Sequence, residues 1–136
     1  MQKGQIVRRM VNSGTPVGPY MRIINAQGAW VEVEKLDSGF CTAILKTHVY
    51  EPKVVKLIIP DVILDRIKSG IQKAIIHDLT PRWEQLRKIK PEVISLRSIK
   101  YSQKVVLFSV QEMRIVYYNR QPQLRVEIAE MLYKHD

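Results

Sequence analysis

The sequence is poor in cysteine and in long apolar runs, and both absences narrow the class of protein. Its 136 residues include a single cysteine, Cys41, which excludes an internal disulfide and gives no sign of an oxidising compartment. The first ten residues, MQKGQIVRRM, contain no apolar run as long as the core of a signal peptide. No other stretch approaches the roughly 20 apolar residues of a membrane-spanning helix. We therefore expect a cytoplasmic protein without a membrane partner.

Acidic residues are also scarce. Asp and Glu total 13 against 22 Lys and Arg, which gives a formal net charge of +9 at pH 7. The hydrophobic fraction of 46% and the charged fraction of 26% are those of a globular protein and not of a disordered tail. A strong positive excess favours polyanionic partners, most often RNA or another nucleic acid. A basic surface that only keeps the chain soluble is the alternative interpretation.

Motifs that would indicate an enzyme or a metalloprotein are missing as well. The residues His48, His77, His135 and Cys41 show none of the spacings that zinc ligands share. The sequence has no glycine-rich phosphate-binding loop and no Ser/His/Asp order of a hydrolase triad. We therefore expect no cofactor, no metal and no catalytic residues, and we favour a binding protein over an enzyme.

The first half of the sequence has the pattern of short strands joined by tight turns. Strands are predicted at 5–11, 20–25, 30–34 and 40–45, with turns at 12–16, 26–28 and 37–39. The third strand alternates most clearly, because Trp30, Glu32 and Glu34 share one face while valines occupy the other. Trp30 is therefore expected to be partly exposed or covered by the second half. The segment 1–53 is predicted to be a small SH3-like β-meander.

In the second half, strands alternate with helices before further strands follow. Strands are predicted at 54–59, 71–77, 92–99, 104–110 and 113–118, the second of them mostly buried. One helix follows Pro60 and ends at Gly70, and another covers 82–90, after Thr80 and Pro81 as N-cap and first residue. The final segment, 124–132, is predicted as a strand, with a continuation into a helical turn left open.

The apolar spacing also predicts which side chains turn inward. The residues expected to pack in the core are Val62, Ile63 and Ile67 of the first helix, Trp83, Leu86 and Ile89 of the second, and at least one of Tyr117 and Tyr118. The predicted fold class is α+β, mainly β, with two short helices in the segment 54–136.

Short motifs in the second half resemble the ASCH domains, relatives of the PUA fold that are frequent in bacterial and phage genomes. The matching stretches are Lys68-Ser69-Gly70, Thr80-Pro81-Arg82-Trp83 and Leu96-Arg97-Ser98, followed by Tyr101. Their order and spacing fit over roughly 75 residues, about 54–132. The resemblance implies a β-barrel with two helices packed across one side.

A weaker resemblance concerns the first half. The stretches Gly4-Gln5-Ile6-Val7, Ser13-Gly14-Thr15-Pro16, Met21-Arg22-Ile23-Ile24 and Trp30-Val31 are similar to small SH3-like modules of bacterial and phage proteins. Because the function of those modules is mostly unassigned, the resemblance implies a shape alone.

The ASCH resemblance includes departures that concern activity. Relatives that hydrolyse modified nucleosides use a lysine and a glutamate in this region, and some carry an arginine. At the matching positions this chain has Gln72, Ile75 and His77. An isoleucine cannot transfer a proton, so the resemblance supports the fold and argues against an enzyme. The alternative is an ASCH-type hydrolase acting on a modified nucleoside or RNA, with Lys73 as a displaced catalytic lysine.

Positive charge is concentrated between residues 82 and 104, where seven basic residues face two acidic ones. Side chains of this kind neutralise backbone phosphates, and a tyrosine among lysines can stack on an unpaired base. We predict a nucleic-acid-binding site composed of Lys73, His77, Arg82, Arg87, Arg97, Lys100, Tyr101 and Lys104. The preferred function is binding of nucleic acid, RNA before DNA. A phage or mobile-element module that binds an acidic protein partner is a further alternative.

Overall fold

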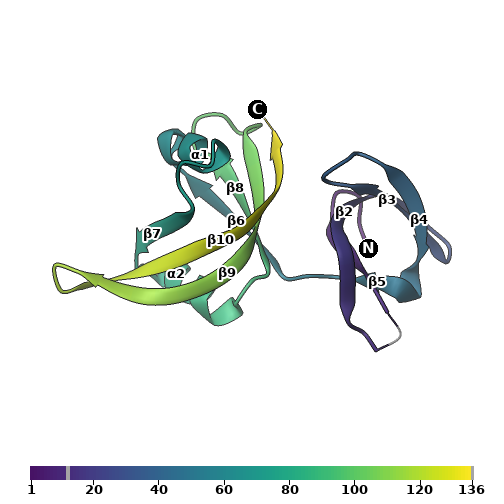
Figure 1. The fold of residues 1–136 in the computed structure, drawn as a ribbon, viewed down its shortest axis with the longest axis horizontal. Helices are drawn as coiled ribbons and strands as arrows, with labels where there is room; N and C mark the ends of the chain where they lie inside the picture. The colour runs from purple at the N-terminus through teal and green to yellow at the C-terminus, as the bar shows by residue number, and fades with distance from the viewer. Residues whose placement is uncertain (12, 136) are drawn as a thin grey trace. The chain divides into compact units, whose positions relative to one another are not determined.

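The computed structural model describes residues 1–11 and 13–135 and divides into two compact units, Met1–Pro52 and Lys53–Asp136 (Figure 1). Each unit contains a five-stranded sheet with its own buried core. The turn predicted at 12–16 begins at Asn12, which lies outside the described residues. The prediction of a mainly β protein of α+β class is confirmed, because strands make up most of both units and the described α-helices are two.

The first unit is an antiparallel meander. Its strands are β1 (Ile6–Met10), β2 (Pro16–Gln27), β3 (Trp30–Lys35), β4 (Cys41–Leu45) and β5 (Val49–Tyr50), in the order β4-β3-β2-β1-β5. A 3₁₀ turn at Lys46–His48 leads the chain back to β1. Val31 and Val33 are fully buried while Trp30 is 53% exposed, as the alternation in β3 predicts. The four predicted strands are confirmed, and the two-residue β5 was too short to show a pattern.

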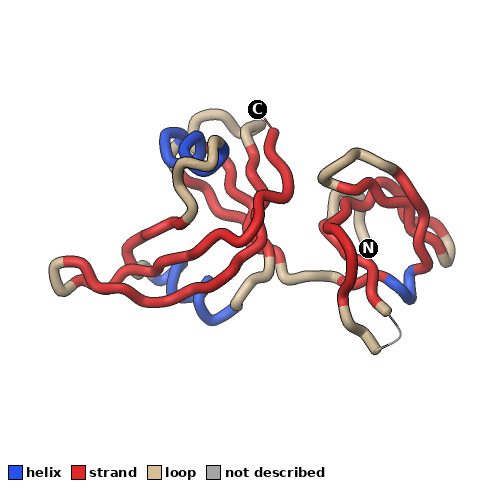
Figure 2. The backbone as a smooth tube through the Cα atoms, in the orientation of Figure 1, coloured by secondary structure: helices blue, strands red, loops and turns tan. Residues whose placement is uncertain are grey.

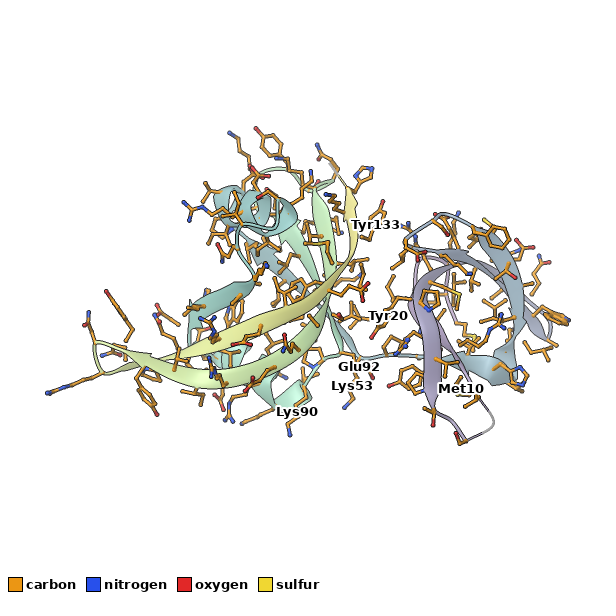
Figure 3. The ribbon with its side chains drawn as sticks, in the orientation of Figure 1. Met10, Tyr20, Lys53, Lys90, Glu92 and Tyr133 are labelled. Carbon is orange, nitrogen blue, oxygen red and sulfur yellow. The ribbon has the colours of Figure 1, made fainter. Side chains whose placement is uncertain are left out.

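The second unit contains both α-helices. Its elements are β6 (Val54–Ile59), α1 (Asp61–Lys68), β7 (Ala74–Asp78), α2 (Pro81–Ile89), β8 (Val93–Ser98), β9 (Val105–Tyr118) and β10 (Gln121–His135). The sheet order is β6-β8-β9-β10-β7, with β6 parallel to β8 and the other neighbours antiparallel. Glu92 and Lys53 lie side by side where β8 and β6 begin, and the Glu92 N–H donates to the Lys53 carbonyl at 3.0 Å (Figure 3).

The core of the second unit lies between its sheet and the two helices. Leu64 and Ile67 of α1 and Trp83 and Leu86 of α2 are at most 5% exposed, and Phe108 of β9 is fully buried. Strand pairing among the described residues ends at β6 and β7, so the hydrogen bonds describe an open sheet. Neither described α-helix has the length and apolar character needed to cross a bilayer.

Several predictions of burial are wrong, for reasons that tertiary pairing explains. Val62 was expected to face inward but is 61% exposed, because α1 packs through Leu64 and Ile67 instead. Ile89 is 37% exposed at the last turn of α2. The strand predicted at 71–77 was expected to be mostly buried, yet β7 is an edge strand in which Ile75 alone is buried. Whether a strand lies at the edge of its sheet depends on its pairing partners, which its apolar composition does not reveal.

The two longest strands also differ from prediction. Segments 104–110 and 113–118 are one continuous strand, β9, and 124–132 belongs to β10, which pairs with β9 as far as His135 opposite Val105. The helical alternative for the end of this segment is therefore wrong. Tyr117 and Tyr118 are 74% and 68% exposed, so the expectation that one of them is buried is also wrong. By the strand pairing both lie next to the turn of the β9–β10 hairpin, and Figure 2 shows this hairpin as a long arm.

Candidate nucleic-acid interface

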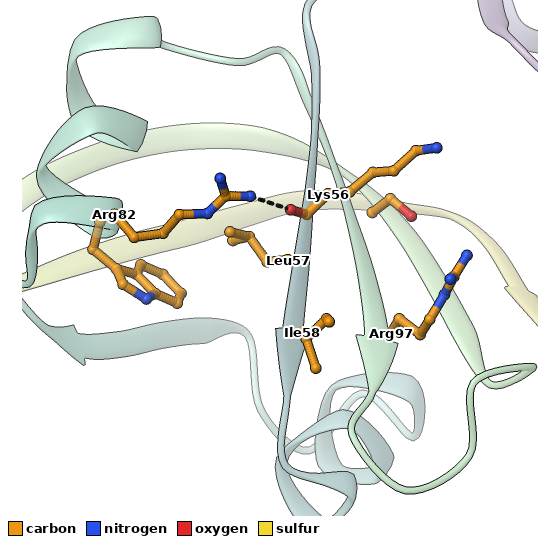
Figure 4. Close-up of a pocket in the computed structure, with 7 residues that line it drawn as sticks. Lys56, Leu57, Ile58, Arg82 and Arg97 are labelled. Atoms are coloured by element: carbon orange, nitrogen blue, oxygen red, sulfur yellow. Dashed lines mark hydrogen bonds between the residues drawn. The ribbon is translucent and has the colours of Figure 1, made fainter.

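A hollow of about 430 Å³ lies along β6, the edge strand of the second sheet (Figure 4). Strand β6, the first turn of α2 and strand β8 each contribute side chains to it. The lining residues are Lys56, Leu57, Ile58, Arg82, Trp83, Ser95 and Arg97. The sequence folds this way because β6 and β8 pair in parallel while Trp83 anchors α2 in the core.

Arg82 fastens the start of α2 to the edge of the sheet. The carbonyls of Lys53 and Ile59 face β8, so that of Lys56, three residues from each, faces the open edge. Arg82 Nη2 donates to this Lys56 carbonyl at 2.9 Å. The guanidinium thus satisfies an edge acceptor that would otherwise bind water or another strand, and its other N–H groups remain available.

The charged residues of the hollow are all cationic. Lys56, Arg82 and Arg97 are exposed, and none of the seven lining residues is Asp or Glu. Lys56 pairs with Ser95 and Ile58 pairs with Arg97 across the parallel strands. Their alternation places Lys56 and Arg97 on one face of the sheet, and Figure 4 shows these two side chains extending in the same direction. Such an arrangement can hold an anion of two or more charges.

Apolar side chains and Ser95 form the rest of the hollow. Leu57 and Trp83 are each 5% exposed, whereas Ile58 is 68% exposed beside them. Cations at the rim of an apolar surface suit a ligand that combines phosphate with flat rings, since the rings cover apolar atoms while the phosphates stay near the cations.

His77 borders the hollow through Trp83. Its imidazole stacks on the indole with ring centroids 4.2 Å apart and planes inclined by 11°. The His77 Nδ1 lies 2.8 Å from the Asp78 carbonyl oxygen. The Asp78 carboxylate instead accepts from Gln123 Nε2 at 3.0 Å. The structure therefore places His77 against Trp83, one of the residues that line the hollow, although His77 itself does not line it.

Lys100, Tyr101 and Lys104 form a separate group in the loop after β8. The ammonium groups of Lys100 and Lys104 lie 5.3 and 5.1 Å from the centre of the Tyr101 ring. Lys104 also binds Asp61 and Asp65 of α1, at 3.4 and 3.3 Å. Two carboxylates therefore already neutralise Lys104, which fits a structural link between loop and helix better than a phosphate contact.

Ser98 organises this loop. Its buried hydroxyl accepts the backbone N–H groups of Lys100 and Tyr101, both at 3.1 Å. A hydrogen bond from the same hydroxyl, followed by the charge of Lys104, holds the pKa of Asp61 below its ordinary value. Although partial burial of its ammonium opposes the charged form, the carboxylates of Asp65 and Asp61 raise the pKa of Lys104.

Two predicted site residues lie elsewhere. Arg87 forms an ion pair with Glu84 one turn earlier in α2, and this pairing raises the pKa of Arg87 and lowers that of Glu84. Lys73 is exposed ahead of β7, where its carbonyl accepts the Ile128 N–H at 3.0 Å. Neither residue lines the hollow.

Of the eight predicted residues, Arg82 and Arg97 meet in the hollow and His77 joins them through Trp83. Sequence reasoning missed Lys56 and Ser95. Lys56 was detectable as the single charged residue in the otherwise apolar strand 54–59. Ser95 gave no signal, because its place in the hollow depends on the parallel register with β6.

Within residues 1–11 and 13–135, no three side chains of His, Cys, Asp or Glu gather as a metal site would require. Comparison with protein-family models gave no match, and neither did comparison with curated proteins or with solved structures. The function is therefore inferred from the site and from the motif resemblance of 54–132.

Proposed function

We propose that this protein binds nucleic acid, RNA in preference to DNA, through the hollow along β6, and that it does so without catalysis. The observation that carries the proposal is the rim of three cations, Lys56, Arg82 and Arg97, around an apolar surface with no carboxylate among the lining residues. A backbone of phosphates with unpaired bases matches both parts of this surface.

The preference for RNA rests on the resemblance of 54–132 to ASCH and PUA-like domains. It is supported by the lining of the hollow, which offers apolar side chains to exposed bases. The hydrolase alternative has less support, because Ile75 is 3% exposed in the core and Lys73 lies outside the hollow.

Fluorescence anisotropy with labelled oligonucleotides tests the proposal. The probes are single-stranded RNA, single-stranded DNA and duplex DNA of about 12 nucleotides, each at about 50 and about 200 mM salt. Arg97→Ala is compared with Arg66→Ala, which removes an equal charge from the exposed side of α1. We expect tightest binding to single-stranded RNA and about a tenfold loss for Arg97→Ala, since hydrogen bonds to charged groups carry that much free energy.

The control decides whether the hollow or the overall charge is responsible. Arg66→Ala should change the affinity by less than about twofold, which is the size of a general electrostatic effect. Equal losses in both variants, or equal affinity for all three probes, would contradict a site in the hollow. The bound surface would then be generic positive charge.

A further inference from the structure

The β9–β10 hairpin ends in a tight two-residue turn. Strand pairing continues to Tyr118 opposite Gln121, which leaves only Asn119 and Arg120 in the loop. Both have positive φ, 48° and 63°, as a type I′ turn requires. Figure 2 shows the strands reaching almost to the end of this arm. Strand pairing therefore continues right up to the turn at the tip.

The last part of the hairpin lacks a third strand. Strand β7 pairs with β10 only from Glu127 opposite Ala74 to Gln123 opposite Asp78. Beyond that point the hairpin consists of two strands that extend past β7 (Figure 1). Side chains of the terminal pairs, Tyr117 with Pro122 and Tyr118 with Gln121, therefore have no sheet neighbour on the β10 side.

Two tyrosines occupy this bare end, one on each face of the ribbon. Tyr117 and Tyr118 are 74% and 68% exposed. Leu124 and Val126 of the same hairpin are fully buried, so the ribbon places apolar side chains in the core where a core is available. Because both rings are exposed, neither stabilises the fold by being buried. Exposed aromatic rings of this kind are typical of contact surfaces.

The charge of the hairpin indicates the kind of partner. Residues 113–126 contain Arg114, Arg120 and Arg125 but no Asp or Glu. The Glu127 carboxylate at the base binds both Arg114, at 3.2 Å, and Arg125, at 3.1 Å. Glu112 lies opposite Glu127, so residues 112–127 hold three arginines and two carboxylates, a surplus of one positive charge, and the turn itself carries Arg120. This charge is complementary to a polyanion.

The hairpin tip is also close to the hollow along the sheet. Leu124 of β10 lies opposite His77 of β7, and His77 stacks on Trp83, which lines the hollow. From the Leu124–His77 pair to the Pro122–Tyr117 pair is two residues, or about 7 Å along the strand. A chain leaving the hollow past His77 can therefore reach Tyr117, which shares the face of Leu124 and His77, and passes around the turn to reach Tyr118 on the other face.

We propose that the tip of the β9–β10 hairpin is a second contact for nucleic acid, at which Tyr117 and Tyr118 stack on unpaired bases and Arg120 contacts the adjoining phosphate. The proposal rests on the proposed function and extends it. The ligand is a single strand, or a duplex end with unpaired bases, that runs from the hollow past His77 to the tip.

The test compares loss of the rings with loss of the hydroxyls. The double variant Tyr117→Ser/Tyr118→Ser removes both rings, and Tyr117→Phe/Tyr118→Phe retains them. The probes are a single-stranded RNA of about 12 nucleotides and one of about 4, the latter too short to occupy both contacts. We expect the serine variant to bind the long probe at least about tenfold more weakly and the phenylalanine variant to stay within about twofold of the wild type. Both variants should bind the short probe as the wild type does.

The outcomes separate the two proposals. If the serine variant keeps full affinity for the long probe while Arg97→Ala loses it, the hairpin contact is wrong and the hollow stands; the tyrosines would then be assigned to a protein partner. If the wild type binds neither probe, both proposals fail. If serine and phenylalanine variants lose affinity equally, stacking is refuted.

Two controls accompany the test. Circular dichroism melting curves that match the wild type ensure that a loss of affinity is not caused by unfolding. The variant Arg120→Gly keeps an Asn-Gly type I′ turn and so measures the effect of the Arg120 charge alone.

Discussion

The imidazole of His77 lies flat on the indole of Trp83, with ring centroids 4.2 Å apart. One ring comes from the edge strand β7 and the other from the first turn of α2, so the stack joins two elements that the short connection Leu79–Thr80 links in the chain. Trp83 also lines the hollow. By stacking on Trp83, His77 therefore supports the wall of the proposed binding site.

We therefore expect His77→Ala to weaken both folding and binding. Loss of an aromatic pair costs about 0.5–1.5 kcal/mol beyond the buried area, and the unsupported indole should bind RNA a few-fold more weakly. His77→Phe keeps the stack and should restore most of the stability. Urea unfolding followed by circular dichroism measures the free energy. Equal stability of His77→Ala and the wild type would show that the stack carries no energy.

The sequence was sufficient to predict elements whose signals are local. The alternation in 30–34, the apolar run 54–59 and the Thr80-Pro81 helix start all gave elements at or near the observed bounds. Trp83 was correctly predicted as core, because a short helix with few apolar residues needs its largest one inward.

Features that depend on which strands and which charged side chains pair in the fold could not be predicted from the sequence. β7 is apolar in composition but lies at an edge, so Ile76 is 49% exposed. Lys104 belongs to the basic cluster in sequence, yet Asp61 and Asp65 lie some forty residues earlier and neutralise it. Only the fold brings these carboxylates to the loop. Of the cations that line the hollow, the sequence thus predicted Arg82 and Arg97 as site residues but not Lys56.

Lowering the pH should weaken the contact between α1 and the loop after β8, because this contact includes the ionised Asp61. The lowered pKa of Asp61 means that the native state binds fewer protons than the unfolded state. The contribution of ionised Asp61 to the free energy of unfolding is therefore fully present above the ordinary carboxyl pKa of about 3.9. It is lost as the pH falls through the lower pKa of the native state. We expect Asp61→Asn to melt below the wild type at neutral pH.

The pH dependence of that difference is diagnostic. The melting temperatures of wild type and Asp61→Asn, measured by circular dichroism from about pH 7 down to about pH 2, should converge at the acidic end, where the wild-type carboxyl is also protonated. Glu84, whose pKa is lowered by Arg87, is present in both proteins and cancels. A constant difference across this range would contradict an ionised Asp61 as the stabilising species.

The charge of Arg82 and the planar geometry of its guanidinium should make separate contributions to RNA affinity. Arg82→Lys keeps the positive charge but loses the planar fork that can bind the Lys56 carbonyl and a phosphate together. We expect Arg82→Lys to lower RNA affinity while keeping the salt dependence of the wild type. Arg82→Ala should lower the affinity further and reduce the log–log salt slope by about 0.7, the value for one phosphate on a single strand.

Anisotropy titrations over a range of salt concentrations measure both quantities. Lys88→Ala, at an exposed position of α2 outside the hollow, serves as the control for loss of charge on the same helix. If Lys88→Ala lowers the slope as much as Arg82→Ala does, phosphate contact at Arg82 is refuted.

The second unit should fold and bind without the first. All seven lining residues of the hollow and both tyrosines of the hairpin tip lie in Lys53–Asp136, and the core from Leu57 to Val126 is complete within it. About 84 residues with a continuous buried core are enough for an independent domain. We expect a fragment of residues 53–136 to melt cooperatively by circular dichroism.

The affinity of this fragment then shows where binding energy arises. If the hollow and the hairpin tip hold the RNA, the fragment should bind the long single-stranded probe within about threefold of the full chain, a difference of less than 1 kcal/mol. Arg97→Ala should weaken the fragment by the same factor as the full chain, because independent contributions add. A folded fragment with no affinity for RNA would place the binding surface in Met1–Pro52 and overturn the assignment to β6.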